Sequence, residues 1–121
     1  MYPIDSIVLY VEDIAVSKRF YTELLERRPQ DLSPTFSSFE LESGLKLELK
    51  QRAESQPPAT ITGGGTELSI LVPDETSLNQ LFEQWKSGGI GFAQEPTTLV
   101  FGQTFVALDP DGHRLRISAL N

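Results

Sequence analysis

The two halves of this sequence repeat one order of elements, which limits the available folds more than any other feature. Strands are predicted from β-branched and aromatic runs, and helices from apolar residues at helical spacing behind a capping aspartate. The first half predicts a strand at Ile4–Val11, a helix from the N-cap Asp13 to about Arg27, a short extended piece at 30–33, and a hairpin of residues 36–41 and 45–50. The second half predicts a strand at Thr66–Val72, a helix capped by Asp74 and ended by Gly88-Gly89, a strand beginning at Phe92-Ala93, a loop at 95–102, and a hairpin of residues 104–108 and 114–118.

The last hairpin has a well-defined turn and an unusual second strand. Its turn, Asp109-Pro110-Asp111-Gly112, combines a proline that presets one turn angle with an Asp-Gly pair that completes it. In the strand that follows, Leu115 and Ile117 alternate with Arg114, Arg116 and Ser118. An arginine in mid-strand, opposite an apolar face, needs either water or an anionic partner.

Matching positions show that the repeat extends beyond the order of elements. Val11-Glu12-Asp13 parallels Val72-Pro73-Asp74 at the corner between strand and helix, and residues 44–48 parallel residues 112–116 after the turn glycine. We therefore predict an α+β fold, in which two βαβββ modules form a curled mixed sheet around a cleft, with the helices on the outer face. The modules span about 1–52 and 65–121, joined by a linker at 53–64, within a single domain of residues 1–121.

Composition excludes several classes of protein. The 121 residues include no cysteine, which rules out disulfides and thiolate metal sites. A net charge of −7 argues against nucleic-acid binding, because that function needs a basic surface. The N-terminus has no pattern of a signal peptide, and no apolar run approaches the roughly 20 residues of a membrane span. We expect a cytoplasmic protein with no membrane partner.

The alternation along the strands selects four polar positions on the face away from the helices. Ser6 and Glu67 each lie five residues before the valine at the corner, and Glu48 and Arg116 each lie four residues after the turn glycine. Because the two pairs are equivalent in the repeat, we expect all four side chains to meet on the floor of the cleft.

A repeated βαβββ pattern with Val-x-Asp corners and a final DPDGHRLRI hairpin resembles the vicinal oxygen chelate superfamily. This superfamily contains glyoxalase I, extradiol dioxygenases, fosfomycin-resistance enzymes, and bleomycin-resistance and related drug-binding proteins. The resemblance covers essentially the whole chain, and residues 7–21 and 101–117 carry its most specific parts. Through residues 33–36 and 101–116, the sequence is most similar to the bleomycin- and phenazine-type resistance proteins.

The resemblance also implies where a metal ion would be held. Enzymes of the superfamily bind their metal with histidine and glutamate at four positions, which fall here on Ser6, Glu48, Glu67 and Arg116. Serine is a poor ligand, and arginine carries a fixed positive charge where the metal would lie. We therefore expect no metal and no other cofactor. The only histidine, His113, is expected to be exposed at the turn, and Ser6 has no histidine base that would make it a nucleophile.

The favoured function is small-molecule binding, in which a planar aromatic, antibiotic-like ligand is sequestered without a metal. Such a site needs apolar and aromatic walls and a few oriented polar groups. The candidate ligand-binding residues are Ser6, Tyr10, Phe36, Glu48, Glu67, Phe101, Phe105 and Arg116. Residues 96–102 are a candidate lid, and Trp85 is assigned to the core beneath its helix.

Two alternatives remain open. The first is a metal-dependent enzyme of the glyoxalase or dioxygenase type with a rearranged site, so catalytic activity is left undecided, with no catalytic residue assigned. The second is a structural or interaction module, in which Glu48, Glu67 and Arg116 form a compensated set of buried charges. Because modules of this superfamily commonly pair across a dimer, we expect a homodimer, with modules paired either within one chain or between two.

Overall fold

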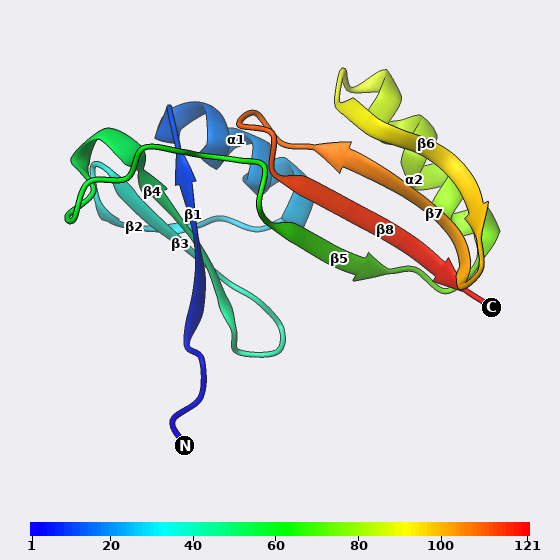
Figure 1. The fold of residues 1–121 in the computed structure, drawn as a ribbon, viewed down its shortest axis with the longest axis horizontal. Helices are drawn as coiled ribbons and strands as arrows, with labels where there is room; N and C mark the ends of the chain where they lie inside the picture. Colours follow the sequence, from blue (N-terminus) through cyan, green and yellow to red (C-terminus); the bar gives the residue numbers. More distant parts are fainter. The chain divides into compact units, whose positions relative to one another are not determined.

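The computed structural model describes all residues from Met1 to Asn121, and the chain divides into two compact units, residues 1–63 and 64–121 (Figure 1). The first unit contains β1 (Ser6–Val11), α1 (Ile14–Leu25), β2 (Gln30–Ser33), β3 (Phe36–Glu40) and β4 (Lys46–Gln51), followed by a 3₁₀ turn at Arg52–Glu54. The second unit contains β5 (Glu67–Leu71), α2 (Glu75–Ser87), β6 (Gly91–Leu99), β7 (Gly102–Leu108) and β8 (Arg114–Leu120). Neither helix is both long and apolar enough to cross a membrane.

The two units have the same sheet topology, which confirms the predicted fold class of two βαβββ modules. The strand order is β1-β4-β3-β2 in the first sheet and β5-β8-β7-β6 in the second, and only the first pair of each sheet is parallel. The register repeats as well, because Ser6 is paired with Lys46 in the first unit and Glu67 with Arg114 in the second. Positions that the repeat makes equivalent therefore lie at equivalent places in each sheet.

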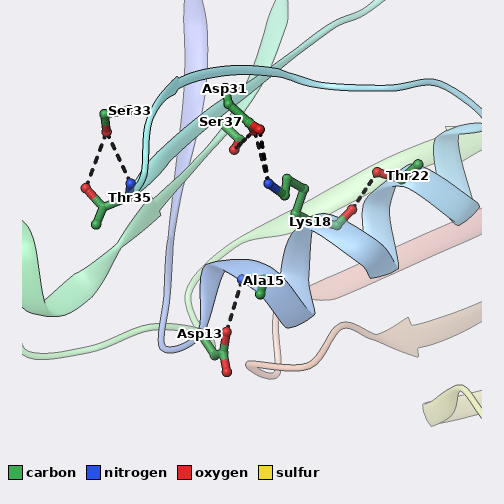
Figure 2. Close-up of polar contacts among 8 residues, drawn as sticks. All are labelled: Asp13, Ala15, Lys18, Thr22, Asp31, Ser33, Thr35 and Ser37. Carbon is green, nitrogen blue, oxygen red and sulfur yellow. Dashed lines mark hydrogen bonds and ion pairs between the residues drawn. The ribbon is translucent and has the colours of Figure 1, made fainter.

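Both predicted helix N-caps are confirmed. The carboxylate of Asp13 accepts a hydrogen bond from the backbone N–H of Ala15 at 3.0 Å (Figure 2), and that of Asp74 accepts one from the N–H of Ser77 at 2.8 Å. Such caps satisfy backbone donors that have no partner within the helix, and each typically stabilises a helix by about 1 kcal/mol. In each unit, the cap fixes the point at which the chain leaves the first strand and begins the helix that packs on the sheet.

The end of α1 differs from the prediction. The helix ends at Leu25 and is followed by Glu26 in the left-handed conformation, with φ of 52°. Arg27, at the predicted end of the helix, lies outside it, donates to the backbone carbonyl of Glu40 and pairs with Glu42 at 3.4 Å. This contact fastens the chain after the helix to the β3–β4 hairpin.

Each helix packs on one face of the sheet in its own unit. In the first unit, Tyr21 of α1 is fully buried and its ring lies 6.4 Å from that of Phe39 on β3. In the second unit, Phe82 and Trp85 of α2 lie 5.5 and 5.7 Å from Phe105 on β7. The assignment of Trp85 to the core is confirmed, since it is only 8% exposed. Each buried side chain of this size contributes about 1.5 to 3 kcal/mol of hydrophobic stabilisation.

The predicted loop at 95–102 is wrong, and the candidate lid at 96–102 consists mainly of strand. Residues 91–99 form β6, Val100 and Phe101 make a two-residue turn, and Gly102 begins β7. Pro96 is accommodated because the pairing of β6 with β7 is irregular between Gln94 and Thr97, a position where a missing N–H is tolerated. The proline and the threonines suggested a loop in a segment that is a strand with a bulge.

Candidate functional site

The sheet face that does not contact α1 carries all four predicted site residues of the first unit, and we call it the far face of the first unit. Register places its side chains in three rows across β1, β4 and β3, since residues two apart in a strand share a face. These rows are Ser6–Lys46–Glu40, Val8–Glu48–Ser38 and Tyr10–Lys50–Phe36. Ser6 and Glu48 therefore share this face on neighbouring strands, one row apart.

The third row combines two aromatic rings with a lysine. Tyr10 and Phe36 lie on either side of Lys50, and all three are half-buried. The ammonium of Lys50 lies 5.3 Å from the centre of the Phe36 ring, within the range of a cation–π interaction. This row supplies flat, partly accessible surface of the kind that a planar ligand needs.

Glu48, at the centre of the far face, is buried without a partner. It is 8% exposed, its carboxylate forms no hydrogen bond or ion pair with the rest of the chain, and its two oxygens keep a small contact with solvent. The lysines two residues away on the same strand are engaged elsewhere, since Lys46 pairs with Asp5 at 3.2 Å and Lys50 lies over Phe36. A carboxylate in such a position is normally paired, because burying an isolated charge is costly.

The corresponding face of the second unit, which does not contact α2, is its far face and carries Arg116. The guanidinium Nε lies 3.1 Å from Oε2 of Glu67 on β5, and Nη1 donates to the hydroxyl of Thr104 on β7 at 3.1 Å. That hydroxyl lies 3.0 Å from the hydroxyl of Ser118, so the arginine belongs to a network of polar side chains. The sequence allows either water or an anionic group as the partner of Arg116. In the structure this partner is the carboxylate of Glu67.

The residues at the implied metal positions do not fit a divalent cation. In the second unit, one position is a guanidinium and the other, Glu67, is already bound to it. A metal ion there would have to displace a fixed positive charge from the carboxylate that neutralises it. In the first unit, Ser6 offers only a hydroxyl and leaves Glu48 as the single anionic ligand.

Gln94 is a residue of the second far face that sequence reasoning missed. It pairs with Val106, which pairs in turn with Arg116, so the three lie in one row. Its side-chain oxygen is buried and has no hydrogen-bond partner. The sequence predicts a loop from residue 95, so the predicted strand is too short to show on which face Gln94 lies.

Two of the candidate aromatic walls differ in their surroundings. Phe105 is fully buried and lies opposite Ile117, on the face that contacts α2, so its assignment as a wall of the site is wrong. Phe101 lies in the β6–β7 turn and is 38% exposed.

His113 is buried, so the expectation of an exposed turn histidine is wrong. It is 2% exposed, and its Nδ1 lies 2.7 Å from Oδ2 of Asp109. The other oxygen of Asp109 accepts from the N–H groups of Asp111 and His113 at 2.9 and 2.8 Å. Ligand-type atoms of Asp109, Asp111 and His113 lie within 4.8 Å of one another, and the hydrogen bonds of Asp109 give this cluster a structural role in closing the turn.

An open groove of about 540 Å³ lies between α1 and β2, and none of the predicted site residues lines it. On one side, Lys18 lies 3.2 Å from Asp31, which also accepts from the hydroxyl of Ser37 at 2.7 Å (Figure 2). The Ser37 hydrogen bond and the Lys18 ammonium lower the pKa of the Asp31 carboxyl. These contacts fasten the exposed edge strand β2 to the helix through Lys18 and to β3 through Ser37.

Comparisons with known proteins agree with this architecture. A sequence model described as the Glyoxalase/Bleomycin resistance protein/Dioxygenase superfamily matches residues 3–117. The phenazine antibiotic resistance protein EhpR of Enterobacter agglomerans is 32% identical over 117 residues, which cover 94% of this chain and 89% of that protein.

Solved structures give the same result for the fold. A solution NMR structure of a protein from Agrobacterium tumefaciens is 42% identical, with a TM-score of 0.90, and the match covers 100% of this chain and 99% of that one. The crystal structure of a glyoxalase-related enzyme from Fulvimarina pelagi is 23% identical, with a TM-score of 0.84, over 98% of this chain and 88% of that one. At that identity the second likeness concerns the fold alone.

Proposed function

Because this chain belongs to the glyoxalase/bleomycin resistance protein/dioxygenase superfamily, we propose that it binds a planar aromatic, antibiotic-like small molecule and sequesters it without a metal ion. The observation that carries the proposal is the 32% identity to a phenazine antibiotic resistance protein over nearly the full length of both chains. A superfamily of this kind hosts several chemistries, so the choice among them rests on the site residues of this chain.

Two features of the far faces support binding without metal chemistry. The row of Tyr10, Lys50 and Phe36 offers aromatic surface beside a cation. The ion pair between Glu67 and Arg116 occupies the two positions where the second unit of a superfamily enzyme would supply metal ligands. Ser6, Tyr10, Phe36, Glu48, Glu67, Phe101 and Arg116 remain the proposed ligand-binding residues.

We also propose that the protein is a homodimer. In the sheets of their own units, β1 and β5 are end strands, each with one edge that pairs with no other strand of the sheet. Both strands expose apolar side chains, since Val8 is 38% exposed and Leu71 is 62% exposed. Unpaired edges with exposed apolar residues favour association.

Calorimetric titration of the purified chain tests the proposed function, with phenazine, phenazine-1-carboxylic acid and bleomycin as probes. We expect saturable binding of a phenazine that raises the melting temperature, and we expect the ligand to be recovered chemically unchanged. Binding should be the same with and without EDTA, because no step depends on a metal. Absence of binding and of thermal stabilisation across the panel would overturn the proposal. Conversion of the ligand, or metal-dependent lactoylglutathione formation, would instead favour an enzyme.

A further inference from the structure

We infer that Glu48 is the anchoring group of the binding site, and that it accepts a hydrogen bond from an amine or hydroxyl group on the aromatic ligand. The inference rests on the proposed function and specifies the class of ligand. Glu48 is more than nine-tenths buried and has no hydrogen-bond or ion-pair partner in the chain. An ionised carboxylate is an acceptor only, so what it lacks is a donor.

The internal repeat explains why the first unit leaves this charge uncompensated. Glu48 occupies the position of Arg116, and Ser6 occupies the position of Glu67. In the second unit these positions hold an acid and a base that pair at 3.1 Å. In the first unit the same positions hold Glu48 and Ser6. The strand β1 therefore lacks the basic side chain that would balance the charge of Glu48.

Neither neighbouring lysine replaces that missing base. Lys46 and Lys50 lie on the same face, two residues before and after Glu48, but their ammonium groups are directed to Asp5 and to the Phe36 ring. The buried carboxylate therefore lies between two cations that it does not contact. A ligand donor at this place would satisfy Glu48 without disturbing either of them.

The surroundings of Glu48 restrict the ligand to a planar aromatic molecule that carries a donor. The aromatic row of Tyr10, Lys50 and Phe36 is adjacent to the row of Glu48 on the same sheet face. A ring that lies against the aromatic row can direct an amine or hydroxyl substituent at the carboxylate, and hydrogen bonds to an ionised acceptor are the stronger kind. The net charge of −7 likewise favours neutral or cationic ligands over acidic ones.

The test compares three probes of one shape: 1-aminophenazine, which has a donor, unsubstituted phenazine, which has none, and phenazine-1-carboxylic acid, which is an anion. Each is titrated calorimetrically into the wild type and into Glu48→Gln, Glu48→Leu and Glu40→Gln. Glu40 is the matched control, because it is an exposed glutamate on the same sheet face. We expect the wild type to bind 1-aminophenazine about tenfold or more tightly than phenazine.

Glu48→Leu should abolish this preference and leave the affinity for phenazine within about threefold, whereas Glu40→Gln should retain the preference. Glu48→Gln should show an intermediate preference for 1-aminophenazine over phenazine, because its amide oxygen is an uncharged acceptor. This variant replaces Glu48→Leu in the comparison if the leucine variant does not fold. The unliganded Glu48→Leu protein should melt at a higher temperature than the wild type, since a buried charge without a partner has been removed.

Three outcomes would overturn the inference and are distinguishable. Equal binding of all three probes, unaffected by substitution of Glu48, would leave the proposed function standing and remove the role of Glu48. Failure of every probe to bind would overturn the proposed function and this inference with it. A lower melting temperature for both Glu48 variants would show that the carboxylate is satisfied within the protein, which also contradicts the inference.

Discussion

Arg116 on β8 reaches Glu67 on the neighbouring parallel strand, with 3.1 Å between Nε and Oε2, although the two residues are not directly paired in the sheet. The contact is diagonal, because Glu67 is paired with Arg114, two residues before Arg116. Both side chains keep some exposure, 22% for Arg116 and 40% for Glu67. Their arrangement turns two positions at which superfamily enzymes bind metal into an ion pair.

Replacing Arg116 with methionine should have a small effect on stability. A partly exposed ion pair contributes up to about 1 kcal/mol, and the hydrogen bond to Thr104 about as much again. Urea denaturation of Arg116→Met should therefore show a loss of about 1 to 2 kcal/mol in the free energy of unfolding. Arg114→Met, an exposed arginine on the same face, is the control and should change little. A loss of more than about 3 kcal/mol with unchanged ligand binding would favour a purely structural role for the charge cluster.

The alternation of apolar and polar residues predicts the sheet face of a side chain correctly wherever one face of the strand is polar. In β4 and β8, leucine and isoleucine alternate with charged residues, and the positions of Glu48 and Arg116 on the far faces follow directly. In β7 the same reasoning fails, because Thr104 and Val106 are as deeply buried as Phe105. With both faces buried, the sequence of β7 has no contrast that identifies the side facing α2.

Tertiary contacts account for the other differences between prediction and structure. The spacing of Asp109 and His113 was visible in the sequence, but their burial depends on packing that no local pattern reports. The second half of β6, residues 95–99, is predicted as loop because Pro96 and the threonines after it are typical of loops, and only the pairing with β7 makes this segment a strand. Likewise, Gln94 acquires its place in the row of Arg116 only through that pairing.

Truncation of Phe105 should destabilise the protein strongly, whereas truncation of Phe101 should not. Phe105 is fully buried among the rings of Phe82, Trp85 and Phe92, and a change from phenylalanine to alanine in such a core costs about 3 to 5 kcal/mol. Phe101 is 38% exposed in a turn, so Phe101→Ala should cost less than about 1 kcal/mol. Urea denaturation of the two variants measures the difference. Similar losses for both would contradict the assignment of Phe105 to the core and Phe101 to the surface.

Acid should weaken the attachment of β2 through Asp31. The Ser37 hydrogen bond and then the Lys18 ammonium lower the pKa of this carboxyl in the folded protein. A pKa lowered by folding adds stability at pH values above the unfolded pKa, and this stability is lost as the pH falls through the folded pKa. The free energy of unfolding of Asp31→Asn should therefore decrease less than that of the wild type between pH 7 and about pH 3.

Ser37→Ala provides the comparison for this pH effect, because it removes the larger cause of the shift while the carboxyl remains. Its pH dependence should lie between those of the wild type and Asp31→Asn. Parallel curves for all three proteins would show that Asp31 contributes nothing to the acid sensitivity.

Light scattering at micromolar concentration should give a mass of two chains. The prediction follows from the unpaired edges of β1 and β5 and the exposed apolar residues along them. A charge on such an edge opposes association, so Leu71→Lys should shift the mass toward one chain, whereas a lysine at the exposed turn residue Val100 should not. A wild-type mass of one chain under these conditions would refute the dimer.

Gly102, the first residue of β7, should tolerate no side chain. A Cβ atom at this position would lie 2.2 Å from the backbone oxygen of Ala119, and neither backbone can yield without breaking the β7–β8 pairing. The backbone φ of 139° adds strain, because residues that carry a side chain rarely adopt this backbone conformation. We expect Gly102→Ala to lower the free energy of unfolding by about 2 kcal/mol or more. Gly91→Ala is the control. Gly91 is the first residue of β6, at the open end of the β6–β7 hairpin, and a Cβ there meets nothing within 4 Å. Equal stability of the two variants in urea would show that the close approach of Gly102 to Ala119 does not constrain the hairpin.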